Sequence, residues 1–147
     1  ADYFGTVPAD RLKVGDGVIR FSGDGQYRSK IGLTPQRAKP VLGSYDATRQ
    51  LLTLVQYTKP EGATDYVNSM WELQAEPFKG DVVNSYNDGP PSPGVKPLGP
   101  FYELESSSPA LALKPGESAA HIHRTIHLQG GEAAVRALGQ ALLGAIE

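Results

Sequence analysis

The sequence contains no cysteine among its 147 residues, which excludes disulfides, thiolate nucleophiles and cysteine-ligated zinc. No apolar run approaches the ~18 residues that span a bilayer. No basic run is present either, and 14 Lys and Arg against 16 Asp and Glu give a formal charge of −2. A near-neutral chain of this kind is a poor candidate for wrapping nucleic acid or coating an anionic membrane. We therefore expect neither nucleic acid nor a membrane as a partner.

Several motifs with known chemistry are also missing. The chain has no Gly-rich phosphate loop, no Gly-x-Ser-x-Gly turn and no His-Glu-x-x-His metal site, and its Asp-Gly turns lack the terminal Glu of a calcium loop. We therefore expect no cofactor. The first residue is Ala1 rather than Met, and no signal peptide is visible, so we expect a removed leader or a piece of a longer protein. The compartment is left open.

Glycine and proline are abundant instead, with 17 and 12 residues. So many helix-breaking residues favour short strands joined by turns over a helical bundle. Asp-Gly pairs at residues 16–17 and 24–25 are typical of tight hairpin turns, because both residue types tolerate positive φ. Strands are expected at residues 18–22, 26–33, 41–45, 51–58, 70–74, 82–86, 99–106, 110–114 and 118–128. We therefore predict an all-β fold, an antiparallel β-sandwich, as a single domain over residues 1–147.

Two segments have a more specific pattern. Residues 51–58 carry apolar side chains on both faces, which predicts an interior strand covered on both sides. Residues 131–146 are predicted to form one C-terminal α-helix. Its apolar stripe, expected to pack onto a sheet, consists of Val135, Leu138, Leu142 and Ile146.

All three histidines fall within seven residues, at His121, His123 and His127. On a strand these three side chains share one face. His121 and His123 are close enough to share a metal ion with a third ligand from another strand, whereas His127 lies about 20 Å along the strand from His121. The alternative is a polar strand face that lines a cleft or an interface without metal, and we favour this metal-free interpretation.

Two acidic residues, Glu103 and Glu105, share one face of the strand expected at residues 99–106. Two carboxylates this close repel each other, so one of them should have a raised pKa if the site is partly dry. Such a pair can act as general acid or base. The alternative is an exposed strand face with solvated acids, although the flanking aromatic and aliphatic residues indicate partial burial.

The segment 84–89 borders a long loop with five prolines between residues 87 and 100. Asn84, Tyr86 and Asp88 combine amide and carboxylate groups with an aromatic ring, as the recognition of sugar hydroxyl groups requires. An ordinary turn, in which the Asn and Asp side chains bond the backbone locally, explains this segment equally well.

The run of residues 99–128, GPFYELESSSPALALKPGESAAHIHRTIHL, resembles the last strands of the galactose mutarotase-like (aldose 1-epimerase-like) superfamily. More closely, the chain resembles the C-terminal part of DUF6786, a bacterial family of unknown function with that fold. The strings that carry this resemblance are DYFGTVPADRLKV, GDGQYRSKIGL, QRAKPVLGSYD, DYVNSMWE, GDVVNSYNDGP and GPFYELESSSPALALKPGES. Members of that family are much longer, so this chain is expected to be the second half of one.

The resemblance implies a β-supersandwich that binds carbohydrate and performs acid/base chemistry on a sugar. In epimerases of this fold, a Glu takes the proton of the anomeric hydroxyl and a His protonates the ring oxygen. Glu105 best matches the Glu position, and Glu103 is the alternative; the epimerase His lies in the missing first half. The resemblance therefore makes Glu105, Glu103, His121 and His123 the catalytic candidates. The candidate sugar-binding residues are Asn84, Tyr86, Asp88, Arg28 and Trp71.

Two other functions remain open. The polar strand faces would serve only as an interface if the chain is a non-catalytic interaction or structural domain. Alternatively, Gly116 followed by His121-x-His123 is similar to the start of a cupin metal motif, although the glutamate of that motif is absent. Half of a supersandwich leaves apolar faces and strand edges open, so we expect a homo-oligomer, in the form of a two-fold dimer.

Overall fold

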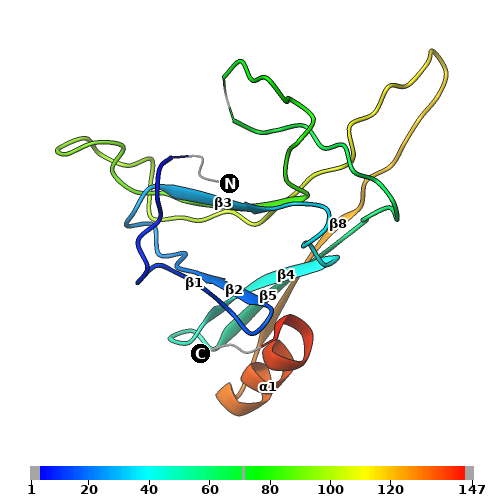
Figure 1. Ribbon diagram of the computed structural model, residues 1–147. Helices are drawn as coiled ribbons and strands as arrows, with labels where there is room; N and C mark the ends of the chain where they lie inside the picture. The colour runs from blue at the N-terminus through cyan, green and yellow to red at the C-terminus, as the bar shows by residue number, and fades with distance from the viewer. Residues whose placement is uncertain (1–3, 71, 145–147) are drawn as a thin grey trace.

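The structure is a computed structural model that describes residues 4–70 and 72–144. The chain forms short antiparallel strands and one C-terminal helix (Figure 1), as predicted for an all-β fold of this kind. In order, the elements are β1 (Leu12–Gly15), β2 (Val18–Phe21), β3 (Ser29–Leu33), β4 (Val41–Asp46), β5 (Leu51–Tyr57), β6 (Val83–Asn87), β7 (Glu105–Ser106), β8 (His123–Gln129) and α1 (Glu132–Leu143).

The strands form three sheets, in the orders β1-β2, β3-β6-β7 and β4-β5-β8. The β3-β6-β7 sheet lies over the β4-β5-β8 sheet, and α1 covers the opposite side of β4 and β5 (Figure 1). The β1-β2 hairpin turns at Asp16 and Gly17, which have φ of 53° and 72°. Positive φ at both residues is the geometry of a two-residue hairpin turn, so the prediction for this Asp-Gly pair is confirmed.

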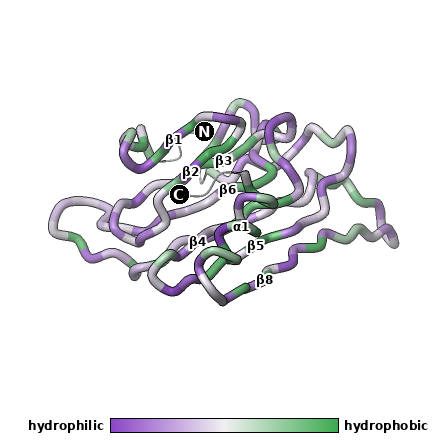
Figure 2. Tube along the Cα trace, turned by 90° about the horizontal axis from the view of Figure 1, so that it is seen from below, coloured by the Kyte–Doolittle hydropathy of each residue, from purple (hydrophilic) through white to green (hydrophobic). Residues whose placement is uncertain are grey.

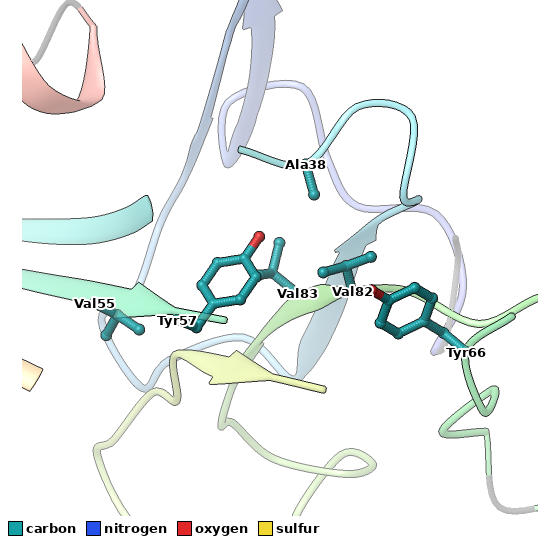
Figure 3. Packing of buried hydrophobic residues seen from close by; sticks show 6 residues of the cluster. All are labelled: Ala38, Val55, Tyr57, Tyr66, Val82 and Val83. Carbon is teal, nitrogen blue, oxygen red and sulfur yellow. The ribbon is translucent and has the colours of Figure 1, made fainter. Parts of the chain in front are cut away.

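The main core lies between the two three-stranded sheets (Figure 3). Strand β5 contributes Val55 and Tyr57 to it, and the opposite face of β5 presents Leu52 and Leu54 to the helix. These four side chains are at most 6 % exposed. The predicted interior strand is therefore confirmed, because alternate residues of β5 are buried in two different cores.

The helix packs on β4 and β5 through a line of residues that differs from the predicted stripe. Val135 is 6 % exposed, as expected, but Leu138 and Leu142 are 40 % and 44 % exposed. The buried line instead continues through Gly139 to Leu143, at spacings of four residues. A hydropathy pattern misses this line because glycine has no side chain to mark the contact. Ile146, the last residue of the predicted stripe, lies outside the described residues.

Several predicted strands are shorter or absent. Residues 70 and 72–74 lie in a loop. Residues 110–114 lie at the start of an arm that is exposed over residues 111–120 and has no strand partner in the part of the chain that the structure describes. Only Glu105–Ser106 of the strand expected at 99–106 is a strand, and β8 begins at His123 rather than at residue 118. The second Asp-Gly pair, at 24–25, does not close a hairpin because β2 and β3 belong to different sheets.

Strand β8 lies at the rim of the molecule, and apolar and polar residues both occur along it (Figure 2). It pairs with β5 along its whole length, and six of its seven residues are exposed. Within residues 4–70 and 72–144, no helix has the length and apolar character needed to cross a membrane.

Candidate functional site

A largely polar surface is built on the face of the β3-β6-β7 sheet that is turned away from β4-β5-β8; we call it the outer face. Val83 of β6 packs in the core between the sheets, so the alternate residues of β6 point to the outer face. The register pairs Asn84 of β6 with Gly32 of β3 and with Glu105 of β7. An isolated bridge between Asn87 and Tyr102 extends the pairing of β6 to the segment before β7. The outer face therefore carries, strand by strand, Arg28, Lys30 and Gly32; Asn84, Tyr86 and Asp88; and Phe101, Glu103 and Glu105.

This face brings together six of the nine residues that were singled out in the sequence. They are Arg28, Asn84, Tyr86, Asp88, Glu103 and Glu105. Their accessibility divides them into two groups. Asn84, Tyr86 and Asp88 are 4 %, 9 % and 1 % exposed, whereas Arg28 and Glu103 are exposed and the Glu105 side chain is 35 % exposed. The buried residues of the central strand β6 and its end thus form the base of the site. The accessible groups come from β3, from β7 and from the residues that precede these two strands.

Glu103 and Glu105 share the outer face, two residues apart, and their carboxyl groups influence each other electrostatically. Partial burial raises the pKa of Glu103, and the neighbouring carboxyl group of Glu105 raises it further, against the opposing charge of Lys30. The Lys30 Nζ lies 3.0 Å from the Glu105 Oε1. The upward direction of the Glu103 pKa is the one expected for two neighbouring carboxyl groups on a partly buried strand face.

The raised pKa of Glu103 predicts how stability depends on pH. Because the folded protein holds the proton more tightly than the unfolded chain does, the stabilisation is fully present below the ordinary pKa of 4.5 and is lost as the pH rises through the folded-state pKa. The Glu103→Gln variant has no titrating carboxyl group at this position, so it does not show this loss of stability. Urea unfolding between about pH 4 and about pH 8 should therefore show its stability increasing relative to wild type. A difference that does not change over this range would contradict the raised pKa.

The buried central strand holds the start of the proline-rich loop in place. The Tyr86 hydroxyl donates to the Asp88 Oδ1 at 2.6 Å, and the Gly99 N–H donates to the Asp88 Oδ2 at 2.8 Å. The Tyr86 hydroxyl and three backbone N–H groups together lower the pKa of Asp88, and burial raises the pKa of Tyr86. Both Asp88 oxygens are thus engaged within the protein. Asp88 therefore has a structural role, as the turn interpretation of this segment allowed. Its bond to Gly99 joins the two ends of the loop and is not a local turn bond.

An aromatic cluster adjoins the polar groups. The Tyr86 ring lies 5.9 Å from both the Phe4 ring and the Phe101 ring, centroid to centroid. The Arg28 guanidinium lies 4.3 Å from the centroid of Phe4, which is 47 % exposed. An exposed ring beside hydrogen-bonding groups suits the apolar face of a sugar. Phe4, Phe101 and Lys30 were not among the residues singled out in the sequence. The alternation along each strand indicates Phe101 and Lys30, but no local pattern marks Phe4.

Asn87, which points to the inner side of β6, bonds the backbone as the turn interpretation expects, but its partners also lie far away in the chain. It is fully buried, its Oδ1 accepts a hydrogen bond of 2.8 Å from the Gly25 N–H, and its Nδ2 donates to the Tyr27 carbonyl at 2.8 Å. Asn87 thereby fixes the turn at the second Asp-Gly pair and positions Arg28, which follows it.

The histidines do not lie with the carboxyl pair. Ser106, which follows Glu105 in β7, points to the opposite, inner face, and its Oγ lies 2.9 Å from the His121 Nε2 and 2.8 Å from the His123 Nδ1. The expected cleft that combines these histidines with Glu103 and Glu105 is therefore not formed. The physical reason is that the strand of His123 pairs with β5 and not with β7.

The metal alternative for His121 and His123 finds no third ligand in the described part of the chain. No group of three His, Asp or Glu side chains there could hold a metal ion. The Ser106 hydroxyl lies between the two imidazoles instead. Trp71, the remaining candidate, lies outside the described residues.

Comparison with known proteins gives a family and no activity. No curated protein and no solved structure matches the chain. A family model described as a family of unknown function, DUF6786, matches residues 1–146. The chain therefore belongs to the DUF6786 family.

Proposed function

We propose that the chain is a carbohydrate-binding domain of mutarotase-like type, and that the outer face of the β3-β6-β7 sheet is its sugar site. The observation that carries the proposal is the pair of carboxyl groups of Glu103 and Glu105 on one strand face, beside Lys30 and an exposed aromatic ring. Sugars are recognised by this combination of paired donors and acceptors with an apolar ring. The resemblance of residues 99–128 to galactose mutarotase-like proteins supports the same class of ligand. It also leads us to propose that the chain is the C-terminal part of a longer supersandwich.

The pair is suited to proton transfer at a sugar hydroxyl group. Glu105, whose charge is balanced by Lys30 at 3.0 Å, is the base that accepts the proton of the anomeric hydroxyl. Glu103, with its raised pKa, is the acid that donates a proton to the ring oxygen while the bond between the anomeric carbon and that oxygen breaks. The reverse transfers close the ring on the other face of the carbonyl group, which exchanges the two anomers without any other reactant.

Arg28 and Phe4 are proposed to orient the sugar. The guanidinium is exposed and stacked on the Phe4 ring, which limits its freedom before a ligand arrives. Asn84 adds a buried Oδ1 that has no hydrogen-bond partner among the described residues, directly opposite Glu105. A buried acceptor of this kind is costly to keep, which marks this position as one where the fold sacrifices stability next to the proposed site.

A panel of monosaccharides tests the proposal by thermal unfolding. A ligand present at 100 times its dissociation constant adds about 2.7 kcal/mol of stability, which is a readily measured shift. The shift should be lost in Glu105→Gln and kept in the matched control Glu61→Gln, which changes a carboxyl group in an exposed loop. A shift that survives in Glu105→Gln, or no shift with any sugar, would contradict the proposal.

A second candidate is a non-catalytic interaction domain that forms a two-fold dimer. The observation that favours it is a set of exposed apolar residues on β8 and in the segment before it. Its residues are Leu111 at 54 %, Leu113 at 49 %, Ile122 at 45 % and Ile126 at 37 % exposure. Such surfaces next to an open strand edge are typical of protein interfaces. A dimer by light scattering, together with no response to any sugar, would favour this second function.

A further inference from the structure

A second, separate cavity lies between the two layers, on the inner faces of the sheets. It has a volume of about 280 Å³ and is lined by Thr53, Val55, Tyr102, Leu104, Thr125 and His127. Thr53 is opposite His127 and Val55 is opposite Thr125 in the β5-β8 register, so these four residues form its floor. Tyr102 and Leu104, from the segment that leads into β7, form the facing wall. None of the residues of the outer-face site lines this cavity.

The polar groups of the floor are held in place by the protein. The Thr53 Oγ1 lies 3.0 Å from the His127 Nδ1, which fixes the orientation of the imidazole. Thr125 and His127 are both exposed, so a molecule that enters from solvent can reach them. Between them, the threonine hydroxyls and the imidazole offer both donors and acceptors.

The wall is held on two sides. The Tyr102 hydroxyl is 2.8 Å from the Ser44 Oγ of β4. A Cβ placed on Gly23 would lie 2.8 Å from the Tyr102 Cγ, so only a glycine at this position leaves room for the ring. Tyr102 is thus clamped between β4 and the turn after β2. The cavity is therefore formed in advance by the fold.

The lining selects the chemistry of the ligand. Three side chains offer hydroxyl groups and one an imidazole, two are aliphatic, and none of the six carries a permanent charge. Ligand pockets usually measure about 300–1,000 Å³, so a cavity at the lower limit of this range fits a small molecule. We infer that this cavity binds a small neutral polyol, held by hydrogen bonds from Thr53, Thr125 and His127, at a site independent of the outer face.

Xylitol is the probe, and gluconate, a polyol of similar size that carries a carboxylate, is its charged counterpart. The chain has only three histidines, so the imidazole resonances in an NMR spectrum report on His127 directly. At about 10 mM, ten times a dissociation constant of 1 mM, xylitol should shift the His127 resonances more than those of His121 and His123. Gluconate should shift them much less.

Two variants link the response to the cavity. Thr125→Val keeps the shape of the side chain and removes a hydroxyl group, and it should weaken xylitol binding about fivefold, as expected for one hydrogen bond. Its matched control is Thr64→Val, in an exposed loop. Gly23→Ala should also weaken binding because it displaces the Tyr102 ring without changing a polar group. Its control is Gly15→Ala, where an added Cβ meets no atom within 4 Å.

The outer-face variant Glu105→Gln should leave the xylitol response unchanged, which separates the cavity from the proposed sugar site. Three results would overturn the inference: no shift of the His127 resonances at this concentration, an equal response to gluconate, or unchanged binding in both Thr125→Val and Gly23→Ala. Thermal unfolding of each variant verifies that it is folded, so that the loss of binding is assigned to the cavity.

Discussion

Replacing Leu52 with alanine is expected to destabilise the fold by about 2–5 kcal/mol, the usual cost of truncating a buried leucine. Leu52 is fully buried, in the small core that it forms with Leu54 and Val135 between β5 and α1. The lost stability is the sum of the burial free energy of the removed methyl groups and the cost of the cavity that they leave. Urea unfolding followed by circular dichroism measures the change as a lower midpoint with an unchanged slope.

The matched control is Leu73→Ala, because Leu73 is 104 % exposed in the loop between β5 and β6. Its free energy of unfolding should stay within about 0.5 kcal/mol of wild type. If both variants are equally stable, β5 is not the buried interior strand and the layered arrangement of sheet and helix is wrong.

Asn87→Ala is expected to have an effect of similar size for a different reason. The change removes the acceptor of the buried Gly25 N–H and leaves that group without a partner, whereas the Tyr27 carbonyl keeps the hydrogen bond from the Ser29 hydroxyl. An unsatisfied buried group costs about 1–3 kcal/mol, so a loss of about 1–3 kcal/mol in the free energy of unfolding is expected. Chemical unfolding measures it directly.

Asn68→Ala is the control for this variant, because Asn68 is only partly buried and its Oδ1 bonds the N–H of Met70, two residues away. It should cost much less than Asn87→Ala. Hydrogen exchange adds a second measurement, since the Gly25 amide should lose protection in Asn87→Ala alone. Unchanged protection of that amide would show that Asn87 does not hold the turn.

The parts of the fold that the sequence predicts correctly depend on local patterns. The apolar residues on both faces of β5 mark an interior strand, and the first Asp-Gly pair marks a hairpin, since each feature is decided within a few residues. The helix was placed correctly but its contact line was not, because Gly139 makes a contact without a hydrophobic side chain. The exposed arm was taken for a strand because alternation alone does not show whether a partner strand exists.

The sequence predicts which site residues share a face of one strand, but it does not predict which strands lie next to each other. Alternation puts Glu103 with Glu105, and Asn84 with Tyr86, on one face. Which of these faces meet depends on the register and order of strands far apart in the chain, which no local pattern contains. The histidines show the limit most clearly: β8 follows β7 in the chain, yet it pairs with β5, and this pairing places His123 on the other side of the β3-β6-β7 sheet from Glu105.

Neighbouring residues of β7 provide the most direct test of the central claim that the outer face binds the sugar. Glu105 and Ser106 are adjacent in the chain and point to opposite faces of the same strand. The measurement is the dissociation constant, by calorimetry, of the monosaccharide with the largest thermal shift, for Glu105→Gln and Ser106→Ala. The account predicts at least about tenfold weaker binding, or 1.4 kcal/mol, in Glu105→Gln and an unchanged constant in Ser106→Ala. Weaker binding in Ser106→Ala with wild-type binding in Glu105→Gln would place the sugar on the histidine side and contradict it.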